Sequence, residues 1–399
     1  MMEMLSNRVK NMAESATLAM AAKAREYKSR GINVISLSLG EPDFKTPKHI
    51  QEGAKAAIDE GKYFAYPPVN GYVDLREAIS DKFKRENGLD YGPNQIVVSN
   101  GAKQSIANVF QAIINEGDEV IVFAPFWVSY SALIELAGGI PVLISGDITT
   151  DFKVTADQLA GAFTSKTKAV IFSSPCNPTG SVFTKEELIP ISEEIMKHEN
   201  VVVVADEIYE HINYTGAHAS IGTLPGMLDR TVTVNGMAKG FAMTGWRVGY
   251  IGAPLWLAKA CNKVQGQFTS ANCGIAQRAA LTGLTSDLEP TREMAKEYLR
   301  RRDFVKDLLD EIPGFKTNIP QGAFYFFPDI SAYFGKSDGE TTINNASDLS
   351  MYLLDHAHVS MVTGEAFGDP NCIRLSYAAS EEDLREAISR IKKALSKLS

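Results

Sequence analysis

The chain has 399 residues, 45% of them hydrophobic and 22% charged, which suits a globular enzyme with two domains or one large domain and a smaller lobe. Its 40 basic and 48 acidic residues give a net charge of -8, which argues against a general nucleic-acid or anionic-membrane surface. No apolar run approaches the roughly 20 residues that span a bilayer. The N-terminus lacks the apolar core of a signal peptide and the four cysteines include no CxxC pair, so we expect a cytoplasmic protein with reduced thiols.

The first two thirds of the chain alternate between helical and strand-like patterns. A helix is expected over 15–30, opened by Ser15 or Thr17 and closed by Gly31. Further helices are expected near 48–60 and 73–87. Strand-like runs lie at 33–39, at the start of 96–104, and at 119–124, 140–144, 168–173, 201–206, 231–235 and 248–252. Continuous apolar strands separated by helices predict an α/β fold with a mostly parallel sheet covered on both faces.

The pattern changes after about residue 285. Residues 286–312 read as one long, charged, amphipathic helix. Three strands and a closing helix are expected after it, at 323–327, 358–362, 372–377 and 381–398. We therefore predict a large domain over 46–285 and a smaller α+β domain formed by 1–45 and 286–399.

One lysine stands out in the stretch TVTVNGMAKGFAMTGWRVGY, residues 231–250. Lys239 follows a buried strand and has apolar neighbours such as Phe241 and Met243, and desolvation of this kind makes a lysine amine a usable nucleophile. Arg247, eight residues later, offers a planar fork for a phosphate or carboxylate. The pair predicts a covalent Schiff-base site with an anion anchor, although a surface lysine and a structural arginine remain the alternative.

An acidic residue ends another strand. Asp206 follows the four valines of 201–204, and ligand sites in parallel sheets gather at the carboxyl ends of strands. A buried carboxylate at this position needs a cationic partner. A plain strand-end acid is one alternative. A metal cluster with Glu207, Glu210 and His211 is another, but the run lacks a zinc-ligand spacing such as HExxH.

A possible phosphate cradle lies at SNGAKQ. Gly101, Ala102 and Lys103 stand between a strand and a helix, where free backbone N–H groups and the helix dipole favour an anion. Most turns of this kind bind nothing, so the motif is weak evidence by itself.

From Ser15 to about Glu381 the sequence resembles the class I pyridoxal-phosphate aminotransferases, and within them the bacterial aspartate aminotransferase branch. The stretch around Lys239 looks like their cofactor-lysine signature. The resemblance implies the aminotransferase fold, fold type I, with a large domain around a mostly parallel sheet and a smaller α+β domain. It also implies pyridoxal 5′-phosphate as cofactor, no metal, and small amino and keto acids as substrates.

The resemblance assigns roles residue by residue. Three residues would be catalytic: Lys239 bonds the cofactor and moves the substrate proton, Asp206 keeps the ring nitrogen protonated, and Tyr209 donates to the ring's phenolic oxygen. The other cofactor contacts would be Gly101, Ala102 and Lys103 in the phosphate loop, Arg247, Trp127 stacked on the ring, Asn177 on the phenolic oxygen, and Tyr66, which reaches the phosphate across a dimer interface. The substrate contacts would be Arg374 and Gly40 on the α-carboxylate, Lys103, Ser15 and Thr17 near a distal carboxylate, and Trp127 and Asn177.

Some positions keep a second interpretation or depart from the family. Ser15 also suits a simple helix cap, and Trp127 also suits a packed tryptophan. Gly236 stands where many relatives have a serine, and Glu14, preceded by alanine, stands where they have proline, which argues against bulkier dicarboxylates such as prephenate. Cys176 has no flanking histidine base, so we interpret it as a tolerated neighbour of the site.

We therefore expect a homodimer with shared active sites that transfers the amino group of L-aspartate to 2-oxoglutarate. One alternative is an aminotransferase specific for prephenate, aromatic amino acids or alanine, and another is a different pyridoxal-phosphate reaction on the same fold. A non-catalytic regulator is the remotest, because the family match begins within about 15 residues of Met1 and leaves no room for a preceding DNA-binding segment.

Overall fold

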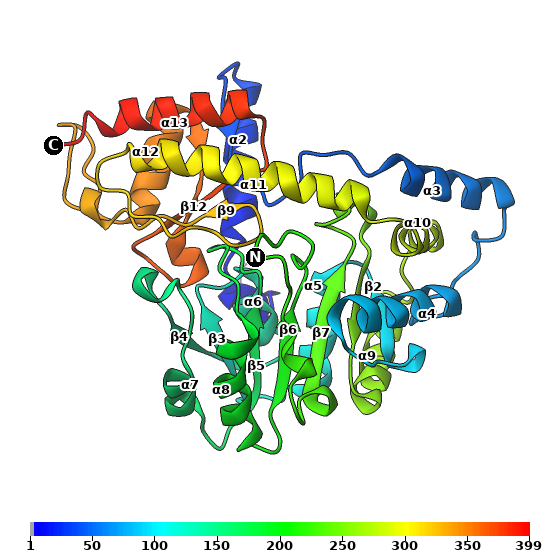
Figure 1. Ribbon diagram of the computed structural model, residues 1–399. Helices are drawn as coiled ribbons and strands as arrows, with labels where there is room; N and C mark the ends of the chain where they lie inside the picture. The colour runs from blue at the N-terminus through cyan, green and yellow to red at the C-terminus, as the bar shows by residue number, and fades with distance from the viewer. Residues whose placement is uncertain (1–3) are drawn as a thin grey trace.

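The computed structural model describes residues 4–399 (Figure 1). Residues 1–3, the start of the predicted small domain and of the stretch considered for a signal peptide, lie outside the described residues. The helices are α1 (Asn7–Asn11), α2 (Ala16–Ser29), α3 (Lys48–Glu60), α4 (Val73–Lys82), α5 (Ala102–Ile113), α6 (Ser129–Leu136), α7 (Ala156–Ala162), α8 (Lys185–Met196), α9 (Leu255–Phe268), α10 (Gly274–Thr285), α11 (Glu289–Asp310), α12 (Ala346–Ala357) and α13 (Glu381–Leu395). The strands are β1 (Ile35–Ser36), β2 (Ile96–Ser99), β3 (Glu119–Ala124), β4 (Ile140–Ser145), β5 (Thr167–Ser173), β6 (Val202–Asp206), β7 (Thr231–Gly236), β8 (Gly249–Gly252), β9 (Tyr325–Phe326), β10 (Val359–Ser360), β11 (Val362–Thr363) and β12 (Ile373–Ser376). Within 4–399, no helix has both the length and the apolar character needed to cross a membrane.

A seven-stranded sheet in the order β2-β8-β7-β6-β5-β3-β4 forms the centre of the molecule. Its strands from β4 to β7 are parallel, and β8 runs antiparallel between β7 and β2. Side chains alternate between the two faces: in β3, Val120 and Val122 pack with α5, α6 and α9, whereas Ile121 and Phe123 pack with α7 and α8. Because both faces are covered, the central strands β3, β5 and β6 are mostly apolar along their length. The predicted mostly parallel, doubly covered sheet is confirmed.

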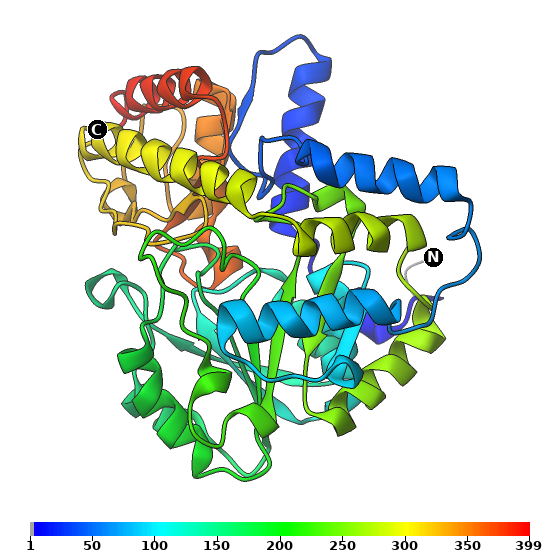
Figure 2. The ribbon, with the colours of Figure 1, turned by 45° about the vertical axis from the view of Figure 1, so that its right-hand side comes forward.

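Near β2 and β8 the covering layer is formed by α3, α4 and α10, which share one apolar cluster (Figure 2). The pattern predicted at 73–87 is one continuous stretch, in which α4 passes into a π-helical turn at Phe83–Asn87. The predicted first helix is confirmed as α2, with Ser15 at its N-cap and Gly31 at a positive φ of 84° after its end.

The C-terminal elements form a second group with two small sheets, the parallel pair β1-β10 and the antiparallel sheet β11-β12-β9 (Figure 1). The helices α11, α12 and α13 share one apolar core with these strands. Three predicted strands were clearly too long, and one of them, at 323–327, is only β9. The strand at 33–39 is only β1, since its partner β10 is equally short, and the run 358–362 divides into β10 and β11, which pair with different strands.

Tyr209 and Ile212, just after β6, belong to this second core. The carboxyl end of the central sheet therefore packs directly beneath the C-terminal elements. The domain limits at 45 and 285 stay a prediction.

Candidate active site

A cavity of about 510 Å³ lies at the carboxyl ends of the parallel strands. Each of four neighbouring strands is followed by a residue that lines it: Trp127 after β3, Asn177 after β5, Asp206 at the end of β6 and Lys239 after β7. Arg374 of β12 lines it from the second group of elements. These residues are far apart in the chain and meet because parallel strands end at the same edge of a sheet.

Lys239 is half-buried, and its Nζ donates to the carbonyl oxygen of Gly40 over 2.5 Å. The same Nζ lies 5.6 Å from the centre of the Tyr209 ring. Burial lowers the pKa of Lys239 to about 8, against the opposing charge of Glu41. A much larger fraction of this amine is therefore neutral near pH 8 than for an ordinary lysine, as a nucleophile or proton acceptor requires.

Asp206 is buried with no cation in ion-pair contact among the described residues. Its Oδ2 accepts from the Tyr130 hydroxyl over 2.6 Å, and its Oδ1 accepts from the backbone N–H of Ile208 over 3.2 Å. Burial raises the pKa of Asp206 to about 6, and these two hydrogen bonds oppose the rise. A buried carboxylate held in this way suits a cationic group in the cavity.

Arg374 is only 1% exposed. It donates to Asn177 Oδ1 over 2.9 Å and to the carbonyl oxygen of Ser38 over 2.5 Å, while its Nε has no partner within the described chain. The guanidinium lies 4.5 Å from the centre of the Tyr325 ring. The Tyr325 hydroxyl in turn lies 2.6 Å from that of Tyr209. A buried arginine without a carboxylate is a preformed site for an anion.

The N-terminus of α5 faces a second arginine. Gly101 is the N-cap at φ 86°, and a Cβ on it would lie 2.2 Å from an Nη of Arg247. Glycine is therefore required for the guanidinium to approach the helix start. Arg247 donates to the carbonyl oxygens of Thr244 and Asn100 over 2.9 and 3.2 Å. Lys103, in the first turn of α5, lies 5.0 Å from the centre of the Trp127 ring.

The charges around the cavity are unbalanced. Its lining contains four cations, Lys103, Lys239, Arg247 and Arg374, and two acids, Glu41 and Asp206. Within residues 4–399 none of the four cations forms an ion pair with a carboxylate. With a helix N-terminus at one end and a buried arginine at the other, the residues fit a ligand that carries a phosphate, a cationic ring and a carboxylate.

Most residues predicted from the sequence line this cavity. They are Ser15, Thr17, Gly40, Ala102, Lys103, Trp127, Asn177, Asp206, Tyr209, Lys239, Arg247 and Arg374. Gly101 lies immediately before the lining residue Ala102 as the N-cap of α5. Ser15 is at an N-cap but makes no capping hydrogen bond with its side chain. Tyr66 does not line the cavity of its own chain and is 97% exposed.

The departures from the family have structural reasons. A Cβ on Gly236 would lie 2.8 Å from the carbonyl oxygen of Val248, so a serine has no room there without a backbone shift. Burial raises the pKa of Cys176, which disfavours its thiolate, in keeping with the interpretation that it is not a nucleophile. Glu14 is exposed and does not line the cavity. Asp206 lines the cavity, whereas Glu207 lies outside the cavity lining. Asp206 is therefore not part of a group that could hold a metal ion with Glu207, Glu210 and His211, the cluster considered above.

Sequence reasoning missed two tyrosines of the cavity. Tyr130 lies three residues after Trp127, at the start of α6, and this helical spacing was the available signal. Tyr325 lies in the apolar run 323–327, where nothing in the sequence distinguishes a cavity residue from a core residue.

The comparisons with known proteins agree with this site. The model of the family "Aminotransferase class I and II" matches residues 32–391. The chain is 48% identical to the bifunctional aspartate aminotransferase and glutamate/aspartate-prephenate aminotransferase of Petunia hybrida, over 98% of this chain and 82% of that protein. It is 41% identical to the aspartate aminotransferase of Bacillus subtilis (strain 168), over 98% and 99% of the two chains.

Solved structures give the same result. The aspartate aminotransferase from Rhizobium meliloti superposes with a TM-score of 0.95 at 40% identity, over 99% of both chains. The aspartate aminotransferase from Thermus thermophilus with maleate superposes with a TM-score of 0.92 at 42% identity, over 98% of this chain and 99% of that one. The sheet, the cavity at its carboxyl edge and these similarities lead to one conclusion: the chain belongs to the class I and II aminotransferase family, has the fold type I architecture of its relatives, and is an aminotransferase.

Proposed function

We propose that the protein transfers the amino group of L-aspartate to 2-oxoglutarate, with pyridoxal 5′-phosphate bound in the cavity. The observation that carries the proposal is the set of charges without ion-pair partners: the cations Lys103, Arg247 and Arg374 and the buried carboxylate of Asp206 line the same cavity as the desolvated amine of Lys239. When bound, the cofactor supplies an aldehyde that bonds to amines and a charged ring that draws electrons from the substrate Cα.

The residues that would hold this cofactor follow from their positions. The phosphate would fit the start of α5 beside Arg247, where the backbone N–H of Ala102 has no intrahelical acceptor. Gly101, whose own N–H donates to the Ser99 carbonyl oxygen over 2.8 Å, would contribute by leaving room for the approach of Arg247. Trp127 would supply a flat face for the ring, and Asp206 would accept a hydrogen bond from the protonated ring nitrogen. The phenolic oxygen would accept from Tyr209 and Asn177; Arg374 uses only the amide oxygen of Asn177, which leaves its nitrogen available.

Lys239 would bond the cofactor through its amine and, once the substrate amine displaces it, move the proton from the substrate Cα. Its lowered pKa supports this role, because a neutral amine is needed for both tasks. Arg374 would hold the substrate α-carboxylate and so orient the Cα–H bond, with Gly40 beside it.

Lys103, Ser15 and Thr17 would contact the distal carboxylate of a dicarboxylic substrate. All three line the cavity, and Lys103 is a flexible cation at its rim. The relatives named aspartate aminotransferases and the solved relative with maleate, a dicarboxylate, support this choice. Prephenate is the second candidate, because relatives at 48% and 43% identity are named for it.

We also propose that the protein is a homodimer in which Tyr66 reaches the phosphate of its partner's site. Tyr66 is 97% exposed and Phe64 is 70% exposed on the same loop, an unusual arrangement for aromatic residues of a monomer. Phe268, also 70% exposed, ends α9, which contacts this loop through the hydrogen bond from Gln265 to the Val69 carbonyl.

We further propose the large domain over 46–285 and the small domain of 1–45 and 286–399. A cytoplasmic location agrees with the four free cysteines.

The proposal is tested by assaying the purified protein, supplied with pyridoxal 5′-phosphate, on a panel of amino donors with and without 2-oxoglutarate. We expect oxaloacetate from aspartate only when 2-oxoglutarate is present. Keto-acid formation without an acceptor would indicate a different reaction, and faster turnover of prephenate with glutamate or aspartate would favour the second candidate.

A further inference from the structure

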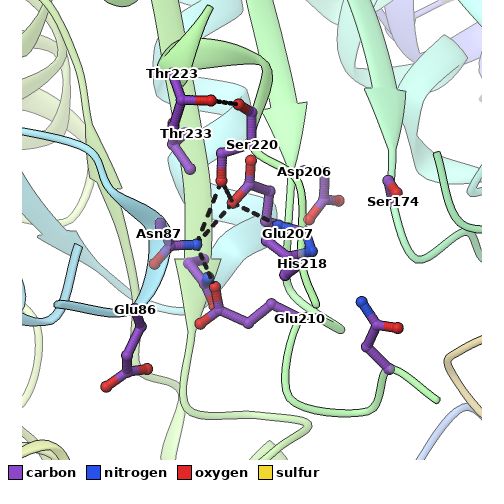
Figure 3. Close-up of polar contacts among 12 residues, drawn as sticks. Glu86, Asn87, Ser174, Asp206, Glu207, Glu210, His218, Ser220, Thr223 and Thr233 are labelled. Carbon is purple, nitrogen blue, oxygen red and sulfur yellow. Dashed lines mark hydrogen bonds and ion pairs between the residues drawn. The ribbon is translucent and has the colours of Figure 1, made fainter. Parts of the chain in front are cut away.

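The turn that follows β6 has two faces. Asp206 and Tyr209 line the cavity, whereas Glu207 and Glu210 are buried outside it. Figure 3 shows the cluster of contacts around Glu207 and Glu210, with Asp206 beside it and joined to it by no contact. The two carboxylates have no place in the proposed chemistry, so their burial needs another explanation.

These carboxylates belong to a closed network with the end of α4 and the π-helical turn. Lys82 Nζ, fully buried, donates to Glu210 Oε1, and also to Asn87 Oδ1 over 2.7 Å. Asn87 Nδ2 donates to Glu210 Oε2 over 2.6 Å and to Glu207 Oε2 over 3.0 Å. Ser220 donates to Glu207 over 2.7 Å. One amide therefore joins both carboxylates of the turn to a neighbouring helix.

Two histidines complete the network. His218 Nε2 lies 2.9 Å from Glu207 Oε2, and His211 Nε2 lies 2.9 Å from Glu86 Oε2. The acids and histidines are close enough to hold a metal ion. However, the ammonium of Lys82 already supplies a cation there, in contact with Glu210 and 3.8 Å from Glu86. We therefore interpret the network as one of ion pairs and hydrogen bonds centred on Lys82, which needs no metal ion to hold its acids together.

The same turn touches the segment that carries Lys239. A Cβ on Gly240, the next residue, would lie 2.8 Å from the Cβ of His211. The ring of Phe241 lies 5.3 Å from the His211 ring in an edge-on arrangement. The network therefore fixes one end of the turn against the lysine segment and the other end, through Glu207, beside Asp206.

Stability alone does not account for this arrangement. Taking charges out of water is unfavourable, and a buried ion pair replaced by apolar side chains of similar size is often neutral or stabilising. Compared with apolar side chains, a hydrogen-bonded network holds the backbone that carries it in one defined position. In this turn that backbone also carries Asp206 and Tyr209.

We propose that Lys82, Asn87, Glu207 and Glu210 form a positioning network that sets the place of Asp206 and Tyr209 relative to Lys239, and with it the affinity of the cavity for a charged pyridine ring. This inference rests on the proposed function. The network residues touch neither ring nor substrate; they act through the turn.

The test is the double variant Lys82→Met/Glu210→Met, which removes the central pair without leaving an unpaired charge. Calorimetry measures binding of pyridoxine 5′-phosphate to the protein freed of cofactor. This probe carries the ring and phosphate but no aldehyde, so it reports ring recognition without a bond to Lys239. We expect a melting temperature close to that of the unsubstituted protein. The affinity for the probe should be about tenfold weaker, because residues that hold a ligand typically lose about this much affinity when a side chain that hydrogen-bonds to them from behind is removed.

The matched control is Lys153→Met/Glu187→Met, which removes an ion pair of 2.9 Å away from the cavity. It should leave probe affinity unchanged. The single variant Glu210→Gln, which keeps the shape of the side chain, provides a second measurement if the double variant fails to fold. Unchanged affinity in a folded network variant would overturn the inference, whereas failure of the unsubstituted protein to bind the probe would instead overturn the proposed cofactor.

Discussion

The hydroxyl of Tyr130 donates a hydrogen bond to Oδ2 of Asp206 over 2.6 Å, and neither side chain is more than 4% exposed. This bond favours the charged form of Asp206 and so lowers its pKa against the effect of burial. The position of Tyr130 at the start of α6, directly after the β3 loop, thus couples the end of β3 to the end of β6, with β5 between them in the sheet.

Replacing Tyr130 with phenylalanine should weaken the hold on a cationic ring. The pKa of Asp206 would rise above about 6, so more of the carboxyl would be protonated near neutral pH. Hydrogen bonds to charged groups contribute about 1.5–3 kcal/mol. We expect cofactor affinity to fall by about tenfold at pH 7 and less at pH 8.5, measured by titration across that range. An equal loss at both pH values would contradict the explanation.

Asp206→Asn should make the cofactor-free protein more stable. The pKa of Asp206 is raised from 3.8 to about 6 on folding, so its charge destabilises the folded state above pH 6, and this penalty disappears as pH falls below about 4. Removing the charge should raise the free energy of unfolding by about 1–3 kcal/mol at pH 7.5. Denaturant unfolding at pH 7.5 and pH 4 measures the difference, and a variant that is less stable at pH 7.5 would refute this account. Cofactor affinity should fall in the same variant.

Lys239→Ala should abolish turnover while the protein stays folded. Among the described residues the Lys239 side chain makes a single hydrogen bond, to Gly40, so its removal breaks few contacts. Loss of the amine that moves the proton should reduce kcat by at least about 10⁴-fold. The visible absorbance of covalently bound cofactor should disappear, and a variant that keeps this band would exclude Lys239 as the attachment point.

The reaction of cofactor-free protein with pyridoxal 5′-phosphate should depend on pH through Lys239. Because its pKa is lowered to about 8, the neutral amine increases as pH rises through 8 and levels off above 9. Stopped-flow absorbance between pH 6.5 and 9.5 should show an apparent midpoint near 8. A midpoint near 10 would mean that the amine is solvated like an ordinary lysine.

Arg374→Met should affect substrates more than cofactor. It removes the fork that we assign to the α-carboxylate, an interaction whose loss costs about 2–5 kcal/mol in a desolvated site. We expect kcat/KM for both aspartate and 2-oxoglutarate to fall by at least about 30-fold, with cofactor binding nearly unchanged. Steady-state kinetics and cofactor titration of the same preparation separate the two effects.

Lys103 should determine the preference for dicarboxylic substrates. Lys103→Ala is expected to lower kcat/KM for aspartate by about tenfold, as for a single partly exposed charge contact. Its effect on alanine should be much smaller, because alanine has no distal carboxylate. The ratio of the two kcat/KM values measures the effect, and a uniform decrease for both substrates would assign Lys103 to the phosphate instead.

The cavity was largely predictable because its chemistry follows the ends of strongly patterned strands. Asp206 and Lys239 both come directly after buried, β-branched runs, and this local signal survives in the sequence. Tyr325 was not predictable, because its place in the cavity depends on how β9 packs over the central sheet. The network around Glu210 could not be predicted either, because Lys82 lies 128 residues from Glu210 in the sequence and reaches it only through the packing of α4.

The spacing in the turn after β6 has a consequence for which changes the chain can accept. Asp206 and Tyr209 share one side, and Glu207 and Glu210 the other, because the members of each pair are three residues apart. Inserting or deleting a single residue between 206 and 209 would break this three-residue spacing. The carboxylate of Glu210 would then face the cavity, and the phenol of Tyr209 would face the ammonium of Lys82. This short segment should therefore tolerate exchange of side chains far better than any change of length.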